Sequence, residues 1–228
     1  MLNFVITEIN QINCNNFTNM QSKVKIYSKE EERWNVITHA AGILLGVVVG
    51  ALFLYNCWAS GGDAVEIISI LLYIFGMLSS YLFSTLYHAT SPVDTKRRAL
   101  LRKFDHSAIY WHIAGSYSPI TIIALYKHGA TNWAVIIFSL VWISAIVGTI
   151  LTFRKMKSHS YFKTICYVIM GLSILIAFKP FYDSVGMDVV MLVILEGVSY
   201  IIGAVLYSFK KIKYSEFEAT IALFNITS

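Results

Sequence analysis

Six long apolar blocks alternate with short loops, and this alternation limits what the chain can fold into. The blocks cover residues 34–58, 64–88, 106–126, 133–153, 161–178 and 187–209. Each holds about the 20 residues that a helix needs to cross roughly 30 Å of hydrocarbon. Apolar residues make up 57% of the chain and charged residues 14%, a balance that argues against an ordinary soluble domain. The sequence therefore predicts an all-α integral membrane protein with a bundle of six transmembrane helices.

The basic residues lie on alternate loops. Of the 18 lysines and arginines, 16 precede the first block or follow the second, fourth and sixth, and the intervening loops hold only Lys127 and Lys179. Because lysine and arginine accumulate on the cytoplasmic side, we expect a cytoplasmic N-terminus and a cytoplasmic segment at 210–213. The net charge of +5 then sets topology and meets anionic membrane lipids, so lipids are the expected partners and nucleic acid is not.

Composition divides the chain into three regions. Residues 1–27 are rich in amide side chains without an amphipathic period, and we expect a disordered polar tail there. Residues 28–213 form the membrane domain, whose first helix is expected to start with Ser28 as its cap and Glu31 completing a capping box. Residues 214–228 would extend only ~22 Å as a helix and contain Glu216 and Glu218, so they are expected not to span.

Small and polar residues in the first block fall on one helical face. The residues on this face are Asn35, Thr38, His39, Gly42, Gly46 and Gly50. Glycines four residues apart let two membrane helices approach closely, so the favoured interpretation is helix packing, with Asn35 and His39 hydrogen-bonded to neighbours. A functional face is the alternative interpretation.

A histidine and a carboxylate are expected at one depth in the membrane. The second block ends at His88, Asp105 directly precedes the third block, and Ser84 lies one turn before His88. Polar side chains at this position usually face the bundle interior, where this set would bind a metal or handle protons. In the alternative interpretation, each group is satisfied at the membrane interface, and Asp105 simply suits the start of a helix.

Four segments, in order, resemble motifs of the bacterial hemolysin III family, which is related to the progestin and adipoQ receptors. The segments are EERWNVITHAAG (31–42), SSYLFSTLYH (79–88), KFDHSAIY (103–110) with GSYSP (115–119), and GAVLY (203–207) with KKIKYS (210–215). The resemblance covers residues 28–215 and implies a seven-helix bundle in the bacterial plasma membrane, with its N-terminus in the cytoplasm.

The resemblance also implies a metal site, zinc in the receptor relatives, near the cytoplasmic leaflet. His88 matches one ligand, and the other two form a His-x-x-x-His pair on the seventh helix. Ser84 and Asp105 match a serine and an aspartate of the same constellation, which ceramidase-like relatives use to hydrolyse lipid amides. In that chemistry zinc lowers the pKa of its bound water, Asp105 takes the proton, and Ser84 bonds the ligand shell or the developing oxyanion.

The chain departs from the family pattern where this chemistry needs it. Glu216 and Thr220 occupy the two positions of the seventh-helix histidines. A frameshift or early stop in the coding sequence would explain the change, and we expect the zinc site to be incomplete and inactive. Two other functions remain open: a membrane-lytic or channel-forming hemolysin, and a non-catalytic homeostasis or receptor-like sensor protein. The absence of a ring of charges in the sequence counts against the channel.

Overall fold

The computed structural model describes residues 27–154 and 160–208, and regular structure in these residues is helical throughout. The elements are α2 (Lys29–Ala59), α3 (Ala64–Ala89), α4 (Thr95–Pro119), the π-helix η1 (Ile120–Tyr126), α5 (Thr131–Phe153), α6 (Ser160–Gly171), the 3₁₀-helix η2 (Ser173–Ala177) and α7 (Phe178–Ser208). The predicted all-α class is confirmed. Residues 1–26 of the predicted tail 1–27 lie outside the described residues, as does the whole predicted tail 214–228.

Four helical stretches are long and apolar enough to cross a membrane. They are Lys29–Ala59, Ala64–Ala89, Thr131–Phe153 and Ile165–Gly203. Large apolar side chains on them point outward, for example Leu44, which is 70% exposed, and Trp58, which is 74% exposed. Such a surface is stable against lipid and unfavourable against water, so the chain is a membrane protein.

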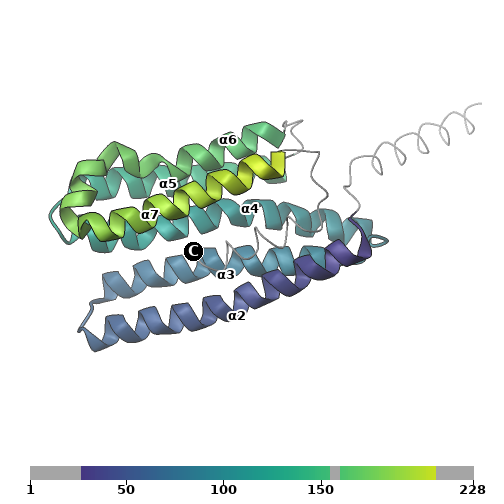
Figure 1. The fold of residues 1–228 in the computed structure, drawn as a ribbon, viewed down its shortest axis with the longest axis horizontal. Coiled ribbons are helices and arrows are strands. Elements are labelled where there is room, and N and C mark those ends of the chain that lie inside the picture. The colour runs from purple at the N-terminus through teal and green to yellow at the C-terminus, as the bar shows by residue number, and fades with distance from the viewer. Residues whose placement is uncertain (1–26, 155–159, 209–228) are drawn as a thin grey trace, which may run out of the picture.

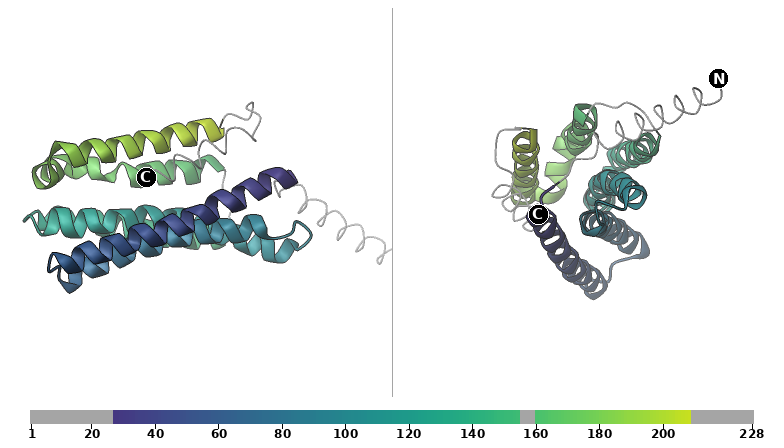
Figure 2. Two further views of the ribbon diagram at one scale, coloured as in Figure 1. Left: turned by 60° about the horizontal axis from the view of Figure 1, so that its bottom comes forward. Right: turned by 90° about the vertical axis from the view of Figure 1, so that its right-hand side faces the viewer.

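The helices from α2 to α5 pack mainly on their neighbours in the chain, whereas α6 packs on both α4 and α5. α2 packs on α3, α3 on α4, α4 on α5, and η1 on α5, while α7 contacts η1, η2 and α6. Viewed along their axes, the helices follow one another around an open horseshoe, with α2 and α7 at its two ends (Figure 2). The apolar core lies between α4, η1, α5, α6 and α7, around Leu125, Ile137 and Val141.

Glycines fix the contact between α2 and α3. A Cβ added at Gly42 would lie 2.6 Å from the Tyr81 ring, and one at Gly50 would lie 2.9 Å from Ile74. Both glycines and Gly46 are buried against α3. The predicted close packing of this face is therefore confirmed.

The third helix starts earlier than the sequence predicts. The apolar blocks at 64–88 and 106–126 predict a connecting loop over 89–104, and this prediction is wrong for 95–104. Asp94 caps the helix, its Oδ1 accepting a hydrogen bond from the Arg97 amide at 3.1 Å. Leucine, lysine and arginine are good helix formers, so α4 forms before the apolar block begins.

Pro119 changes the helix type. A proline has no amide hydrogen to continue the ladder, and α4 gives way to the π-helix η1 directly after it. The Thr121 hydroxyl donates to the carbonyl of Tyr117 at 2.8 Å and thereby satisfies a carbonyl near the break. A second break lies at Gly186, whose φ of 75° interrupts α7 one residue before the predicted start of the last apolar block.

Candidate functional site

Three helix ends meet at one end of the bundle: the start of α2, the end of α3 and the start of α4 (Figure 1). The predicted capping box starts α2. The Glu31 amide donates to Oγ of Ser28 at 3.1 Å, and the Ser28 amide donates to the Glu31 carboxylate at 2.5 Å. This start fixes the rotation of the first turn, and Glu32 then faces α3 and α4.

Arg98 of α4 joins the three helix ends. It is 3% exposed and forms an ion pair with Glu32 of α2. Its Nη1 donates to the carbonyl of Thr90 at 2.6 Å, and its guanidinium carbon lies 4.7 Å from the centre of the Tyr87 ring. Arg98 therefore satisfies a carbonyl left open at the end of α3 while it neutralises a carboxylate of α2.

His88, near the end of α3, is held by Glu32 and Asn35. Its Nδ1 lies 2.6 Å from Oε2 of Glu32 and 3.3 Å from Nδ2 of Asn35. The amide is a donor and the carboxylate an acceptor, so a single nitrogen cannot serve both. The carboxylate is closer and charged, which assigns the proton to Nδ1. The His39 ring lies parallel to His88, with 6.1 Å between the ring centres.

Ser84 and Asp105 lie on the facing sides of α3 and α4. Ser84 is buried, and both Ser84 and His106 interact with the Asp105 carboxylate. The Nδ1 of His106 is 3.4 Å from Oδ2 of Asp105 but lacks the alignment of a hydrogen bond. The structure thus brings the three residues singled out from the sequence, Ser84, His88 and Asp105, to one end of the α3–α4 pair.

The described residues do not supply a complete zinc site. Zinc is held by three or four nitrogen, sulfur or carboxylate ligands. No group of three or more histidine, cysteine, aspartate or glutamate side chains in the described part of the chain is placed to hold a metal ion. Positions 216 and 220, where the family pattern expects ligands, lie outside that part. We therefore derive no reaction step through a metal.

Two residues of this site were missed from the sequence. No role is predicted for Glu32 from the sequence, although Glu32 shares a helical face with Asn35 and His39, three and seven residues on. That spacing was a usable signal. Arg98 was counted among loop charges, and no local pattern distinguishes it from its exposed neighbour Arg97.

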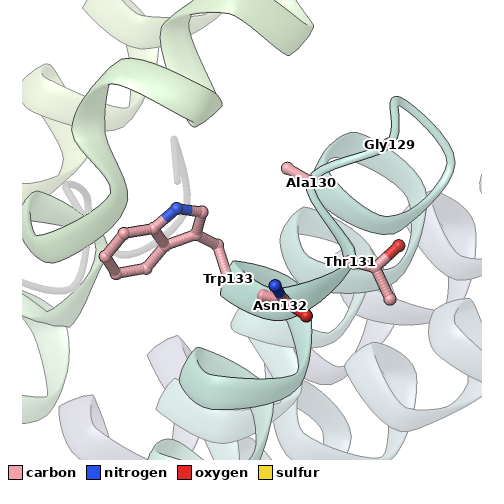
Figure 3. Close-up of a pocket in the computed structure, with 5 residues that line it drawn as sticks. All are labelled: Gly129, Ala130, Thr131, Asn132 and Trp133. Atoms are coloured by element: carbon pink, nitrogen blue, oxygen red, sulfur yellow. The ribbon is translucent and has the colours of Figure 1, made fainter.

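A groove of about 390 Å³ opens beside His88. It is lined by Glu32, Arg33, Val36, Ile37, His88 and Ala89. A smaller pocket of about 190 Å³ lies at the start of α5 and is lined by Gly129–Trp133, with the Trp133 indole extending away from the loop (Figure 3). That pocket is at the opposite end of the bundle and contains none of the site residues.

A cluster of ion pairs lies at the end of the bundle opposite to the site. Lys127, after η1, donates to Oδ2 of Asp63 at 2.7 Å and also pairs with Glu66. Oδ1 of Asp63 caps α3 by accepting from the amides of Val65 and Glu66, each at 3.0 Å. The hydrogen bond from Lys127 lowers the pKa of Asp63, and the same bond raises the pKa of Lys127.

Comparisons with known proteins identify the family. A profile of the family described as "Haemolysin-III related" matches residues 27–222. Hemolysin-3 of Bacillus cereus is 31% identical over 186 residues, which cover 82% of each chain. The Hemolysin-3 homolog of Bacillus subtilis (strain 168) is 34% identical over 189 residues, which cover 83% of this chain and 85% of the relative. The chain is therefore a member of the hemolysin III family.

Proposed function

We propose that the chain crosses the bacterial plasma membrane six times with its N-terminus in the cytoplasm. Residues 106–126, which run through α4 into η1, contain no Asp, Glu, Lys or Arg and match one crossing. The stretch Ile165–Gly203 has 39 residues, about 58 Å as a helix, and Gly186 breaks it; this supports two crossings. Together with α2, α3 and α5 these segments make six.

Cysteine labelling from outside the cell tests this topology. A probe placed at Gly62, Gly129 or Ser184 should react with an impermeant reagent, because these positions lie between apolar blocks, in segments that hold few basic residues. A probe at Thr95 or Ser158 should react only after the membrane is opened. The reverse pattern would refute the six-span arrangement.

We further propose that Ser84, His88 and Asp105 belong to a site of the metal-dependent lipid amide hydrolase type that is incomplete in this chain. The proposal is supported by the interaction of Ser84 with the Asp105 carboxylate and by the Nδ1 proton of His88, which is directed to Glu32. A carboxylate behind a histidine leaves the other ring nitrogen, Nε2, to bind a metal. The chain has Glu216 and Thr220 where the resemblance expects the other two ligands.

Zinc affinity falls when ligands are removed, because each contributes to both binding and geometry. We therefore expect the chain as given to bind zinc weakly and to hydrolyse no lipid amide. A form carrying a seventh helix that opens with histidines at positions 216 and 220 should bind one zinc ion per chain. His88→Ala should then abolish binding.

Metal analysis of the purified forms in detergent is the measurement. His128→Ala is the matched control, because His128 bonds the Ala124 carbonyl at the opposite end of the bundle. Stoichiometric zinc in the unaltered chain would contradict the proposal. Zinc that is unaffected by His88→Ala in the restored form would exclude His88 as a ligand.

A membrane-lytic role is the second candidate, and the name of the Bacillus cereus relative, Hemolysin-3, favours it. Lysis needs a path for water or solutes across the bilayer. Release of a trapped dye from vesicles containing the purified chain tests it, with vesicles that carry the chain unfolded by heat as the control. Release equal in both samples would count against this role.

A further inference from the structure

The groove beside His88 is apolar at one end and polar at the other. Val36, Ile37 and Ala89 supply its apolar wall, and Glu32, Arg33 and His88 supply its polar end. Residues 33, 36 and 37 share one face of α2 because they are three and four residues apart. A groove of this kind matches a molecule with a headgroup and an acyl chain.

The polar end carries one uncommitted positive charge. The Glu32 carboxylate is neutralised by Arg98 and bonded to His88. Arg33 is exposed, and in the described part of the chain the structure gives it no ion-pair partner. A guanidinium presents parallel donors that match phosphate oxygens.

The groove also lies at the depth of lipid headgroups. α2 begins at Lys29, four residues before Arg33, and Trp34 next to Arg33 is 57% exposed. Exposed tryptophans at the ends of membrane helices sit at the boundary between headgroups and acyl chains. A phosphate bound at Arg33 would therefore leave its acyl chain beside Ile37, toward the membrane interior.

We propose that this groove binds an anionic phospholipid, with its phosphate at Arg33 and an acyl chain along Val36 and Ile37. The bound headgroup then lies against His88, so the groove delivers an acyl-chain amphiphile to the site. This last step rests on the proposed function, whose substrate would be a lipid amide with an acyl chain of the same kind. Binding itself needs neither metal nor hydrolysis.

A photo-crosslinking amino acid placed at Ile37 tests the proposal in the full chain. The variant is reconstituted in nanodiscs with equal amounts of phosphatidylglycerol and phosphatidylcholine and irradiated. Mass spectrometry then identifies and quantifies the lipid adducts. The same probe at Leu44 is the control, because Leu44 faces outward on α2 and lies outside the groove. Adducts at position 44 give the composition of the bulk lipid around the protein.

The ratio of phosphatidylglycerol to phosphatidylcholine adducts should be about fivefold higher at position 37 than at position 44. This is the effect expected for one basic residue near a membrane surface. Arg33→Gln should remove this preference, whereas Arg97→Gln, which removes an exposed charge outside the groove, should leave it.

Three results would overturn the proposal: equal lipid ratios at positions 37 and 44, a preference that survives Arg33→Gln, or crosslinks to a second copy or to residues 1–26 in place of lipid. Zinc analysis decides the hydrolase-type site separately. Lipid adducts without zinc in the restored form would leave the groove standing and refute only the hydrolase proposal.

Discussion

Replacing Arg98 by methionine should destabilise the bundle more than any change at an exposed basic residue. Methionine keeps most of the volume and the unbranched shape of the arginine side chain. It removes the partner of the Glu32 carboxylate and the donor to the Thr90 carbonyl. The loss is therefore electrostatic and polar, with little change in packing.

The burial of the pair sets the magnitude. The side chains of Arg98 and Glu32 are 4% and 13% exposed. Removing one partner of a buried ion pair costs about 3–5 kcal/mol, because it leaves a charge without compensation. Glu32 keeps the contact with His88 and some access to solvent, so we expect the lower end, about 3 kcal/mol. Arg97→Met, one residue away and exposed, should change the free energy of unfolding by less than about 0.5 kcal/mol.

The assay is unfolding of the purified protein in mixed micelles, followed by circular dichroism. Comparing Glu32→Gln, Arg98→Met and the double variant gives the coupling energy between Glu32 and Arg98. It should exceed about 1 kcal/mol, because the two groups are in direct contact. Additive effects, or an Arg98→Met variant as stable as Arg97→Met, would show that Arg98 does not join the three helix ends energetically.

Two further changes test other contacts. Gly76→Ala should lower the free energy of unfolding by about 1–3 kcal/mol, because the new Cβ meets the backbone carbonyl of Trp111. The Cβ of Gly197→Ala meets nothing within 4 Å, so this variant should unfold like the unaltered chain in the same mixed-micelle assay. Lys127→Met should reduce the loss of stability between pH 6 and pH 2. The lowered pKa of Asp63 adds stability above its unfolded pKa of about 3.9, and this stability is lost as the pH falls through the folded pKa. Without Lys127 the pKa of Asp63 is lowered less, so less stability is lost. Melting from pH 6 to pH 2 measures it, and parallel curves for both proteins would exclude this role of Lys127.

Local patterns in the sequence were sufficient for the all-helical class, for the start of α2 and for one interface. The capping box at Ser28 involves only four consecutive residues, and the glycines that pack α2 on α3 repeat every four residues. Such features depend only on helix geometry, so they can be read without knowledge of the partners.

Contacts between distant residues could not be predicted in the same way. Glu32 and Arg98 are 66 residues apart, and their pairing depends on the rotation of α2 and on the early start of α4. The sequence placed Ser84, His88 and Asp105 at one depth, and it did not show that Glu32 fixes the proton of His88. Membrane depth is encoded locally, whereas side-chain partners follow from packing.

The neighbour-by-neighbour packing of the horseshoe has a consequence for biosynthesis. Since α2 packs on α3 and α3 on α4, these contacts become available as soon as α4 has left the ribosome. Domains rich in contacts between consecutive elements can form them in order of synthesis. We therefore expect α2, α3 and α4 to associate at the translocon before α6 and α7 are made, and the Glu32–Arg98 pair to be complete at that early stage.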